Sequence, residues 1–321
     1  MTDGGVASAE SAAADAETGA LGALTARLDE RLGADFVESS PFWLPSFLLM
    51  AFFVYGAIGW NVLISLTDFS GFGAVDYGSL DLEMYARALG DPTVVRAAVN
   101  TFALLLGFTV VCLALGLVIA VVVDRGVRFE NTFRTVYLLP MSLSFVVTAQ
   151  FWLWMYDYND GAVNALFGAV GLGPYDFIGN PQFVLGAVVF ALVWQFSGYT
   201  MVVYLAALRA IPDAHYEAAK VDGASVFRMY RRVIVPQLKS ATISAAVVLM
   251  VFALKAFDFL YSLVGGYRPP KGSDILATKM VRVAYQNNEW AYGAAIAMLL
   301  FLMALSVIGP YLTYEYRNDN L

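Results

Sequence analysis

Six long apolar runs divide this chain of 321 residues, and each is long enough to cross a lipid bilayer. A membrane-spanning helix needs about 20 mostly apolar residues, whereas a barrel strand is shorter and alternates apolar with polar positions. Because the runs are continuous, they predict helices. We therefore expect an all-α membrane protein with six transmembrane helices. Their approximate ranges are 42–66, 98–123, 136–156, 182–208, 241–265 and 290–312.

Pro140 interrupts the third apolar run near its start. Proline has no backbone N–H and its ring clashes with the preceding turn, so a helix kinks or unwinds there. Neighbouring helices in a membrane protein can satisfy the freed backbone groups. The third span is therefore predicted to be bent.

The composition agrees with a membrane location and excludes several kinds of chemistry. Apolar residues make up 60% of the chain and charged residues 14%, against about half and about a quarter in a soluble domain. With one cysteine, Cys112, and one histidine, His215, no disulfide and no Cys or His metal cluster is expected. No string Gly-x4-Gly-Lys-Ser/Thr, which would cradle nucleotide phosphates, occurs. We predict no cofactor, no metal and no enzymatic activity.

The distribution of Lys and Arg predicts the orientation, because cytoplasmic loops carry the excess of positive charge. Six spans place both termini on one side. With the termini inside, the outer segments hold only six basic residues: Arg87, Arg96, Arg268, Lys271, Lys279 and Arg282. The inner segments hold twice as many: Arg27, Arg31, Arg125, Arg128, Arg134, Arg209, Lys220, Arg228, Arg231, Arg232, Lys239 and Arg317. Both termini are therefore expected in the cytoplasm, together with the loop 209–238.

Residues 1–40 form an acidic segment before the transmembrane domain, 41–321. They hold eight carboxylates in a chain of net charge −7. An acidic surface keeps a protein hydrated at high salt, so one interpretation is a salt-loving source, and the other is an ordinary solvated tail. Apolar residues recur within it at helical spacing and suggest an amphipathic helix: Leu21, Leu24, Leu28, Leu32 and Phe36.

The polar loop 209–238, between the fourth and fifth runs, carries the strongest signal in the chain. Pro212 and Asp213 are helix-start residues and predict a short helix as far as about Val221. Gly223 then permits a tight turn, and a second helix is expected over 224–232, ended by Pro236. Two short helices around a glycine predict a compact polar projection.

The spacing in this loop is Glu217-Ala218-Ala219, three residues, Gly223, nine residues, then Val233, Ile234, Val235 and Pro236. It resembles the cytoplasmic loop of ABC importer permeases, although that family usually has Ile and Leu where this chain has Val233 and Val235. Further matches are similar to the sugar and glycerol-phosphate branch, which includes the maltose-type permeases. They are Asp91-Pro92, Asn100-Thr101, Phe133-Arg134, Leu138-Leu139-Pro140, Gly161 to Asn164, Ile211-Pro212, Tyr216, Asp222 and Phe257-Asp258. In this chain Tyr267 follows Gly265-Gly266, where the family commonly has Pro.

The resemblance implies that this chain is a non-catalytic subunit that moves a mono- or oligosaccharide across the cell membrane. It implies cytoplasmic ABC ATPases as partners, a second permease subunit that is often a different chain, an extracellular sugar-binding protein and the lipid bilayer, with no nucleic acid. The loop would act as a coupling helix that docks on an ATPase. The residues that carry this role would be Glu217, Ala218, Ala219, Asp222, Gly223 and Ala224.

Polar and aromatic side chains inside the spans are candidates for the substrate pathway. Amides bind sugar hydroxyls and aromatic rings bind sugar C–H faces, although each such residue alone is also typical of helix packing. The candidates are Gln150, Trp154, Gln195, Tyr199 and Tyr261. Lys255 and Asp258, three residues apart, are expected on one helix face, either as an internal ion pair or as part of the pathway.

The alternative function is an ion-coupled secondary transporter in which Lys255 and Asp258 relay a proton or cation. Such transporters are built from internal repeats with broken helices at matching positions. We find no clear internal repeat in this sequence. The ABC permease interpretation is therefore preferred, and the identity of the sugar is not readable from the spans.

Overall fold

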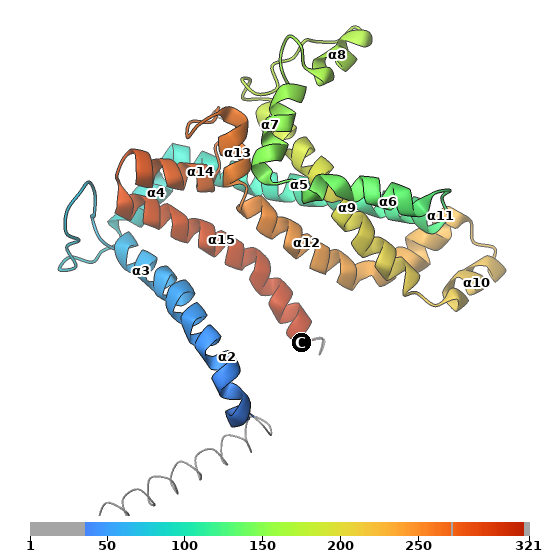
Figure 1. The fold of residues 1–321 in the computed structure, drawn as a ribbon, viewed down its shortest axis with the longest axis horizontal. Coiled ribbons are helices and arrows are strands. Elements are labelled where there is room, and N and C mark those ends of the chain that lie inside the picture. The colour runs from blue at the N-terminus through green and yellow to red at the C-terminus, as the bar shows by residue number, and fades with distance from the viewer. Residues whose placement is uncertain (1–35, 271, 318–321) are drawn as a thin grey trace, which may run out of the picture. The chain divides into compact units, whose positions relative to one another are not determined.

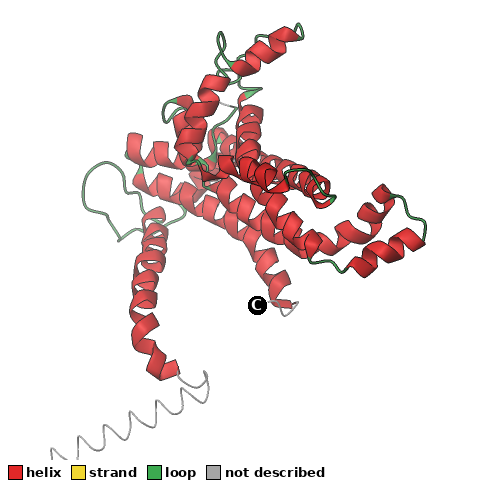
Figure 2. Ribbon diagram, turned by 45° about the vertical axis from the view of Figure 1, so that its right-hand side comes forward, coloured by secondary structure: helices red, strands yellow, loops and turns green. Residues whose placement is uncertain are grey.

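The structure, a computed structural model, describes residues 36–270 and 272–317. Helices and loops account for all of these residues, and none of them forms a strand (Figure 2). The chain divides into two compact units, residues 1–61 and 62–321. The acidic tail and the amphipathic helix predicted within it lie almost entirely outside the described residues.

From residue 36 onward, the first unit holds one long helical segment. It consists of α2 (Phe36–Met50), a π-helical turn (Ala51–Tyr55) and α3 (Gly56–Ser65), which continues into the second unit. Between Ser39 and Ser65 this segment is apolar enough to span a membrane. It matches the first predicted span.

The second unit is built from the remaining helices (Figure 1). The α-helices are α4 (Glu83–Gly90), α5 (Pro92–Asp124), α6 (Glu130–Leu138), α7 (Phe145–Met155), α8 (Ala162–Ala169), α9 (Val184–Arg209), α10 (Asp213–Val221), α11 (Val226–Met229), α12 (Lys239–Leu254), α13 (Phe257–Val264), α14 (Leu276–Val281) and α15 (Trp290–Arg317). The 3-10 turns are Leu139–Ser142 and Val235–Leu238, and the π-helical turns are Tyr230–Ile234 and Arg282–Gln286.

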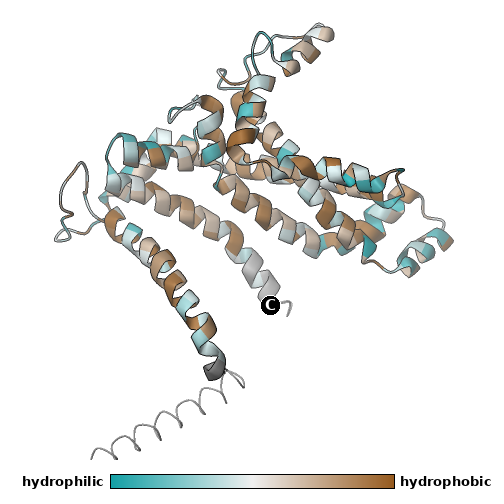
Figure 3. Ribbon diagram, viewed as in Figure 1, coloured by the Kyte–Doolittle hydropathy of each residue, from teal (hydrophilic) through white to brown (hydrophobic). Residues whose placement is uncertain are grey.

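Five helical stretches of the described residues are long and apolar enough to cross a membrane, and six if a bent pair is counted as one span. They appear as the brown helices of Figure 3. The stretches are Ser39–Ser65, Pro92–Asp124, Val184–Arg209, Val226–Leu254 and Trp290–Pro310, with α6 and α7 as the bent pair. The all-helical membrane fold is therefore confirmed.

The third apolar run is two helices and not one. The segments Glu130–Ser142 and Phe145–Met155 meet at an angle of 100°. The break follows the 3-10 turn that contains Pro140, so the bend that this proline predicts in the third span is confirmed. The side chain of Gln195 on α9 donates from Nε2 to the Leu143 carbonyl, 2.8 Å away, and satisfies a backbone group that the break exposes.

The fifth predicted span also differs from a continuous helix over 241–265. α12 ends at Leu254 and α13 begins at Phe257, so the helix is interrupted at Lys255 and Ala256. At the other end, Pro236 does not stop the preceding helix as predicted. It lies in the first turn of the 3-10 segment, where a missing N–H is tolerated, and helical structure runs on from Val226 to Leu254.

The core is organised by the packing of α5 along α9. Buried residues on the two helices form one cluster around Phe108 and Phe196 and a second around Val123 and Leu205. The backbones approach closely at Gly116, where an added Cβ would collide with the Thr200 side chain and lie 2.9 Å from the Met201 nitrogen. Such small residues allow tight helix contacts within membranes.

Gly116→Ala is predicted to destabilise the protein, because the Met201 backbone cannot move away from the added methyl group without shifting α9. The expected cost is about 1–3 kcal/mol, typical of overpacking, read as a lower melting temperature of the purified protein in detergent. Gly107→Ala is the matched control on the same helix, since its Cβ would make an ordinary contact of 3.8 Å with Val189. Equal melting temperatures for the two variants would contradict this packing.

Candidate functional site

The polar loop after α9 folds into a projection that we call the knob, consisting of α10, α11 and the turn between them (residues 213–229). α10 begins at Asp213 directly after Pro212, and α11 begins after Ser225, whose Oγ accepts a hydrogen bond from the Arg228 N–H at 3.4 Å. Figure 3 shows α10 as largely hydrophilic. The short helix expected as far as Val221 is confirmed.

Gly223 turns the chain between the two helices of the knob. Its φ of +68° is a left-handed conformation that glycine adopts without strain. The Ala224 N–H donates to the Ala219 carbonyl and the Gly223 N–H to the Lys220 carbonyl, both at 3.0 Å. These two bonds form a Schellman motif, which satisfies carbonyls left over at a helix end. The turn predicted at Gly223 is therefore present, and local hydrogen bonds hold its geometry.

The inner face of the knob is attached to the ends of α5 and α9. Ala219, Met229 and Tyr230 are buried in the hydrophobic cluster that contains Val123 and Leu205. Tyr230 also donates a hydrogen bond from its hydroxyl to Asp124 Oδ2, 3.1 Å away, at the last residue of α5. The knob is thus joined to the long helices by both apolar packing and a polar contact.

Tyr216 completes this attachment from α10. Its ring meets the Tyr230 ring edge to face, with centroids 6.4 Å apart. Burial raises the pKa of the Tyr216 hydroxyl, and the negative charges of Asp124 and Asp213 raise it further. The hydroxyl therefore stays protonated at physiological pH and donates to the Leu208 carbonyl at 3.5 Å.

The outer face of the knob presents apolar side chains that the sequence analysis did not single out. Phe227 is 74% exposed and Val221 is 87% exposed. The sequence alone gives no signal for this, because only the burial of Ala219, Met229 and Tyr230 in the structure shows which face of the knob is turned outward. Single exposed apolar residues are normal on protein surfaces, but aromatic side chains such as Phe227 are enriched where proteins bind one another.

The six predicted coupling residues fall on different parts of the knob. Ala219 is buried within this chain, so its small side chain serves packing against α9 and α11 and not the approach of a partner. Ala224 is half-buried. The other four are exposed: Glu217, Ala218, Asp222 and Gly223. Ala218 and Asp222 border a hollow of about 350 Å³, which Ala214, His215 and Val233 also line.

The predicted pathway residues on α7 and α13 lie in one region, because these two helices pack together. Gln150 on α7 donates from Nε2 to the Ser262 carbonyl on α13, 2.8 Å away. Tyr261, the neighbour of Ser262, is 36% exposed, and its ring lies against the Tyr267 ring, with centroids 4.7 Å apart and planes inclined by 59°. Trp154, one turn beyond Gln150, is 73% exposed. An amide and aromatic rings are therefore available together on this surface.

The two candidates on α9 occupy a different environment. Gln195 is 2% exposed, and its Nε2 is committed to the bend between α6 and α7, while its Oε1 has no hydrogen-bond partner among the described residues. In this conformation Gln195 positions the bend and lines no open surface. Tyr199 is half-buried against the core cluster around Phe196.

Lys255 and Asp258 do not form the predicted pair. Lys255 follows the last residue of α12 and Asp258 lies in the first turn of α13, so the helix break separates them. Both are exposed, and the described residues contain no ion pair that joins them within 4.0 Å. The expectation of a shared helix face was wrong because it assumed a continuous helix.

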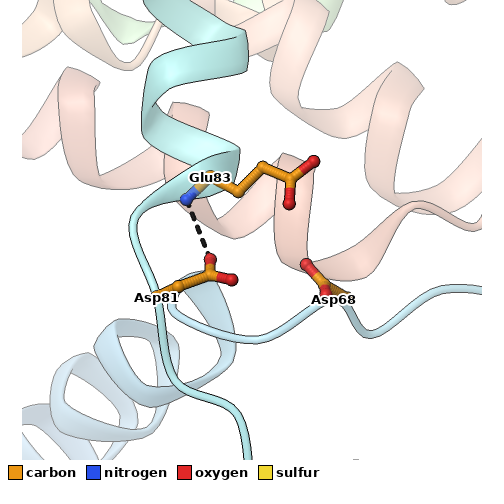
Figure 4. A group of neighbouring side chains, drawn as sticks. All are labelled: Asp68, Asp81 and Glu83. Atoms are coloured by element: carbon orange, nitrogen blue, oxygen red, sulfur yellow. Dashed lines mark hydrogen bonds between the residues drawn. The ribbon is translucent and has the colours of Figure 1, made fainter.

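Three carboxylates outside the knob and the pathway also lie close together (Figure 4). Oxygen atoms of Asp68, Asp81 and Glu83 are within 4.8 Å of one another, and all three residues are exposed. Asp81 Oδ1 accepts the Glu83 N–H at 2.8 Å, which fixes the start of α4. Exposed acidic groups commonly cluster without an ion. We assign no metal site to them.

Gly223→Ala is predicted to loosen the knob by about 1 kcal/mol, because an alanine resists the left-handed conformation although its Cβ would meet no other atom. The measurement is hydrogen exchange of the amides at positions 223 and 224, which should exchange faster. Gly223→Asn is the matched variant, since asparagine tolerates this conformation and should restore most of the protection. Equal protection in the alanine and asparagine variants would contradict strain at Gly223.

Comparison with known proteins identifies the family of this chain. Residues 112–314 match the model of the binding-protein-dependent transport system inner membrane component. The chain is 60% identical over 290 residues to the xylose/arabinose import permease protein XacH of Haloferax volcanii, covering 90% of this chain and 92% of that protein. It is 45% identical over 280 residues to the probable ABC transporter permease protein PH1215 of Pyrococcus horikoshii, covering 87% and 95%.

The fold also matches a solved structure. A chain of the bacterial alginate ABC transporter in complex with alginate pentasaccharide-bound periplasmic protein superposes with a TM-score of 0.74 at 19% identity, covering 91% of this chain and 98% of that one. At this identity the likeness shows the fold alone. The family match and the two relatives go further: this chain belongs to the inner membrane components of binding-protein-dependent transport systems.

Proposed function

We propose that this chain is the membrane-spanning permease subunit of an ATP-driven importer that moves a carbohydrate across the cell membrane. The observation that carries the proposal is the knob, a polar helical projection with exposed apolar residues that is attached to the two central helices of a permease fold. Family membership and the absence of a phosphate-binding loop from the sequence support a separate ATPase as the source of energy.

The substrate that we infer is a pentose. The relative that is 60% identical over most of the chain is named a xylose/arabinose import permease. The surface of α7 and α13 offers an amide, Gln150, and the rings of Trp154 and Tyr261, which suit sugar hydroxyls and sugar C–H faces. That relative comes from Haloferax volcanii, which agrees with the acidic composition expected of a salt-loving source.

The coupling mechanism follows from the two faces of the knob. Phe227 and Val221, with the exposed Glu217 nearby in sequence, would enter a groove on a cytoplasmic ATPase. Buried aromatic anchors of this kind carry much of the energy of protein interfaces. Because Tyr230 and Ala219 join the knob to α5 and α9, a movement of the ATPase would displace these helices with it.

The assembly that we propose has this chain crossing the membrane six times, with α6 and α7 forming one bent span and both termini in the cytoplasm. The excess of Lys and Arg in the segments expected inside, which are the termini, the loop after α5 and the loop 209–238, supports this orientation. A second permease chain, two ATPases and an extracellular sugar-binding protein would complete the importer. The solved alginate transporter, which has the same fold, is in complex with its own periplasmic protein.

Ion-coupled transport through Lys255 and Asp258 is the rejected alternative. It would need the two groups to share a path within one span. The helix break instead places both at exposed positions, with no ion pair between them among the described residues.

The proposal is tested by xylose uptake into proteoliposomes that contain this chain with its ATPases, its partner permease and the binding protein. We expect uptake to require ATP on the side of the membrane that carries the ATPases, and to persist when ion gradients are dissipated. Uptake that continues without ATP and stops when an ion gradient is removed would overturn the proposal.

Phe227→Ala is predicted to weaken the association with the ATPase by at least about tenfold, as expected for loss of an aromatic anchor, and to lower xylose uptake accordingly. Glu217→Ala should lower uptake as well, while the complex still assembles. Phe72→Ala is the control, because Phe72 is 91% exposed but lies in the loop between α3 and α4. If Phe227→Ala and Phe72→Ala retained the ATPase equally in co-purification, the docking role of Phe227 would be refuted.

A further inference from the structure

A basic hollow lies at the opposite end of α5 from the knob. Its volume is about 490 Å³, and its wall is formed by the start of α5, the segment after α13, α14 and the π-helical turn that follows. Four basic side chains and one carboxylate line it: Arg96, Arg268, Lys279, Arg282 and Asp274. Only six Lys and Arg residues are expected on this side of the membrane, and four of them converge here.

Two of the four cations are neutralised within the chain. Lys279 Nζ lies 3.5 Å from Asp91 Oδ2 and donates to Thr93 Oγ1 at 2.6 Å, and Arg282 forms an ion pair with Asp274. Their side chains are only 13% and 15% exposed, so they lie at the bottom of the hollow, where these contacts hold them in place.

The counter-charge on Asp91 is permanent. Partial burial alone would raise the pKa of its carboxyl group, but hydrogen bonds from Thr93 and Tyr292 and the charge of Lys279 outweigh this effect and lower the pKa to about 2. Asp91 is therefore ionised at any physiological pH. Its negative charge balances the positive charge of Lys279, which is then not available to an external ligand.

The other two cations, Arg96 and Arg268, have no partner among the described residues. Both are exposed, and no ion pair or hydrogen bond of their side chains occurs within this part of the chain. The carboxylate that lines the hollow, Asp274, is paired with Arg282, so none is left for Arg96 and Arg268 among the described residues, although acidic residues outnumber basic ones by 26 to 19 in the whole chain. A guanidinium binds a carboxylate through two parallel hydrogen bonds, which makes such a pair of free arginines suited to acidic side chains.

We propose that this basic hollow is the docking site for acidic side chains of the soluble binding protein that delivers the substrate, an inference that rests on the proposed function. The hollow is lined by residues that precede the apolar part of α5 and by loop residues after α13, where a soluble protein has access. Its positive charge and its size fit one or two carboxylate side chains of a protein surface. Arg96 and Arg268 bind these carboxylates, and Lys279 and Arg282 hold the shape of the hollow.

The inference predicts a salt-dependent association. Salt screens exposed charge pairs. Complementary charges at the rim of an interface therefore raise the association rate constant most at low ionic strength. The double variant Arg96→Gln/Arg268→Gln should therefore bind the xylose-loaded binding protein about tenfold more weakly at low salt. The dependence of its Kd on NaCl concentration should be shallower than in the wild type.

The test uses the complete transporter in nanodiscs, with binding of the xylose-loaded protein measured by surface plasmon resonance over a range of NaCl concentrations. Arg96→Lys/Arg268→Lys keeps the charge and should retain most of the affinity. The matched control is Asn159→Asp/Gln182→Glu, which changes the net charge equally at two exposed positions outside the hollow and should leave the affinity within about twofold of the wild type. Melting temperatures report that each variant is folded.

An unchanged Kd in the double Arg→Gln variant, or an equal loss in the control, would overturn the inference. If the loss occurs only in nanodiscs that contain anionic lipid, the hollow binds a lipid headgroup and the inference is also wrong. ATP-driven xylose uptake by the wild type separates these failures from a failure of the proposed function. Uptake by the wild type with unchanged binding by the variant rejects only the docking site, whereas no uptake by the wild type rejects the transport function.

Discussion

The close packing of α5 against α9 is the contact on which the rest of the structure depends. It is possible because Gly116 has no side chain where the Thr200 side chain and the Met201 backbone approach. Thr200 Oγ1 adds a hydrogen bond to the Cys112 carbonyl, 2.9 Å away on the other helix. Without water to compete, such contacts and van der Waals packing hold membrane helices together. Both large hydrophobic clusters draw on this pair of helices.

α5 also connects the two surfaces to which we assign partners. It begins beside the basic hollow with Pro92 and ends at Asp124, which accepts the hydrogen bond from Tyr230 under the knob. Its 33 residues span about 50 Å at 1.5 Å per residue. An extracellular protein and a cytoplasmic ATPase would thus bind near opposite ends of one helix. If the proposed partners bind there, α5 would connect their two binding sites directly.

Much of this arrangement could be predicted from the sequence. The apolar runs indicated α5 and α9 to within a few residues, and Gly223 indicated the turn of the knob, because helix length and left-handed turns leave strong local signals. The break at Lys255 and Ala256 was missed because neither residue is a helix breaker, and the contact of α13 with α7 joins segments that are far apart in the sequence. The basic hollow was missed for a related reason: Arg96 and Arg268 are 172 positions apart, and only the fold brings them together.

We expect the knob and α5 to move as one body when the ATPases close. The most direct measurement is the distance between spin labels at Lys220→Cys on the knob and Val99→Cys on α5, two exposed positions, in a transporter whose Cys112 is fully buried. We predict that this distance stays within about 2 Å, the scale of small adjustments between packed helices, in the nucleotide-free and ATP-bound states. A change of about 5 Å or more, one helical turn, would contradict the account, because the knob would then move without the helix that it is meant to drive.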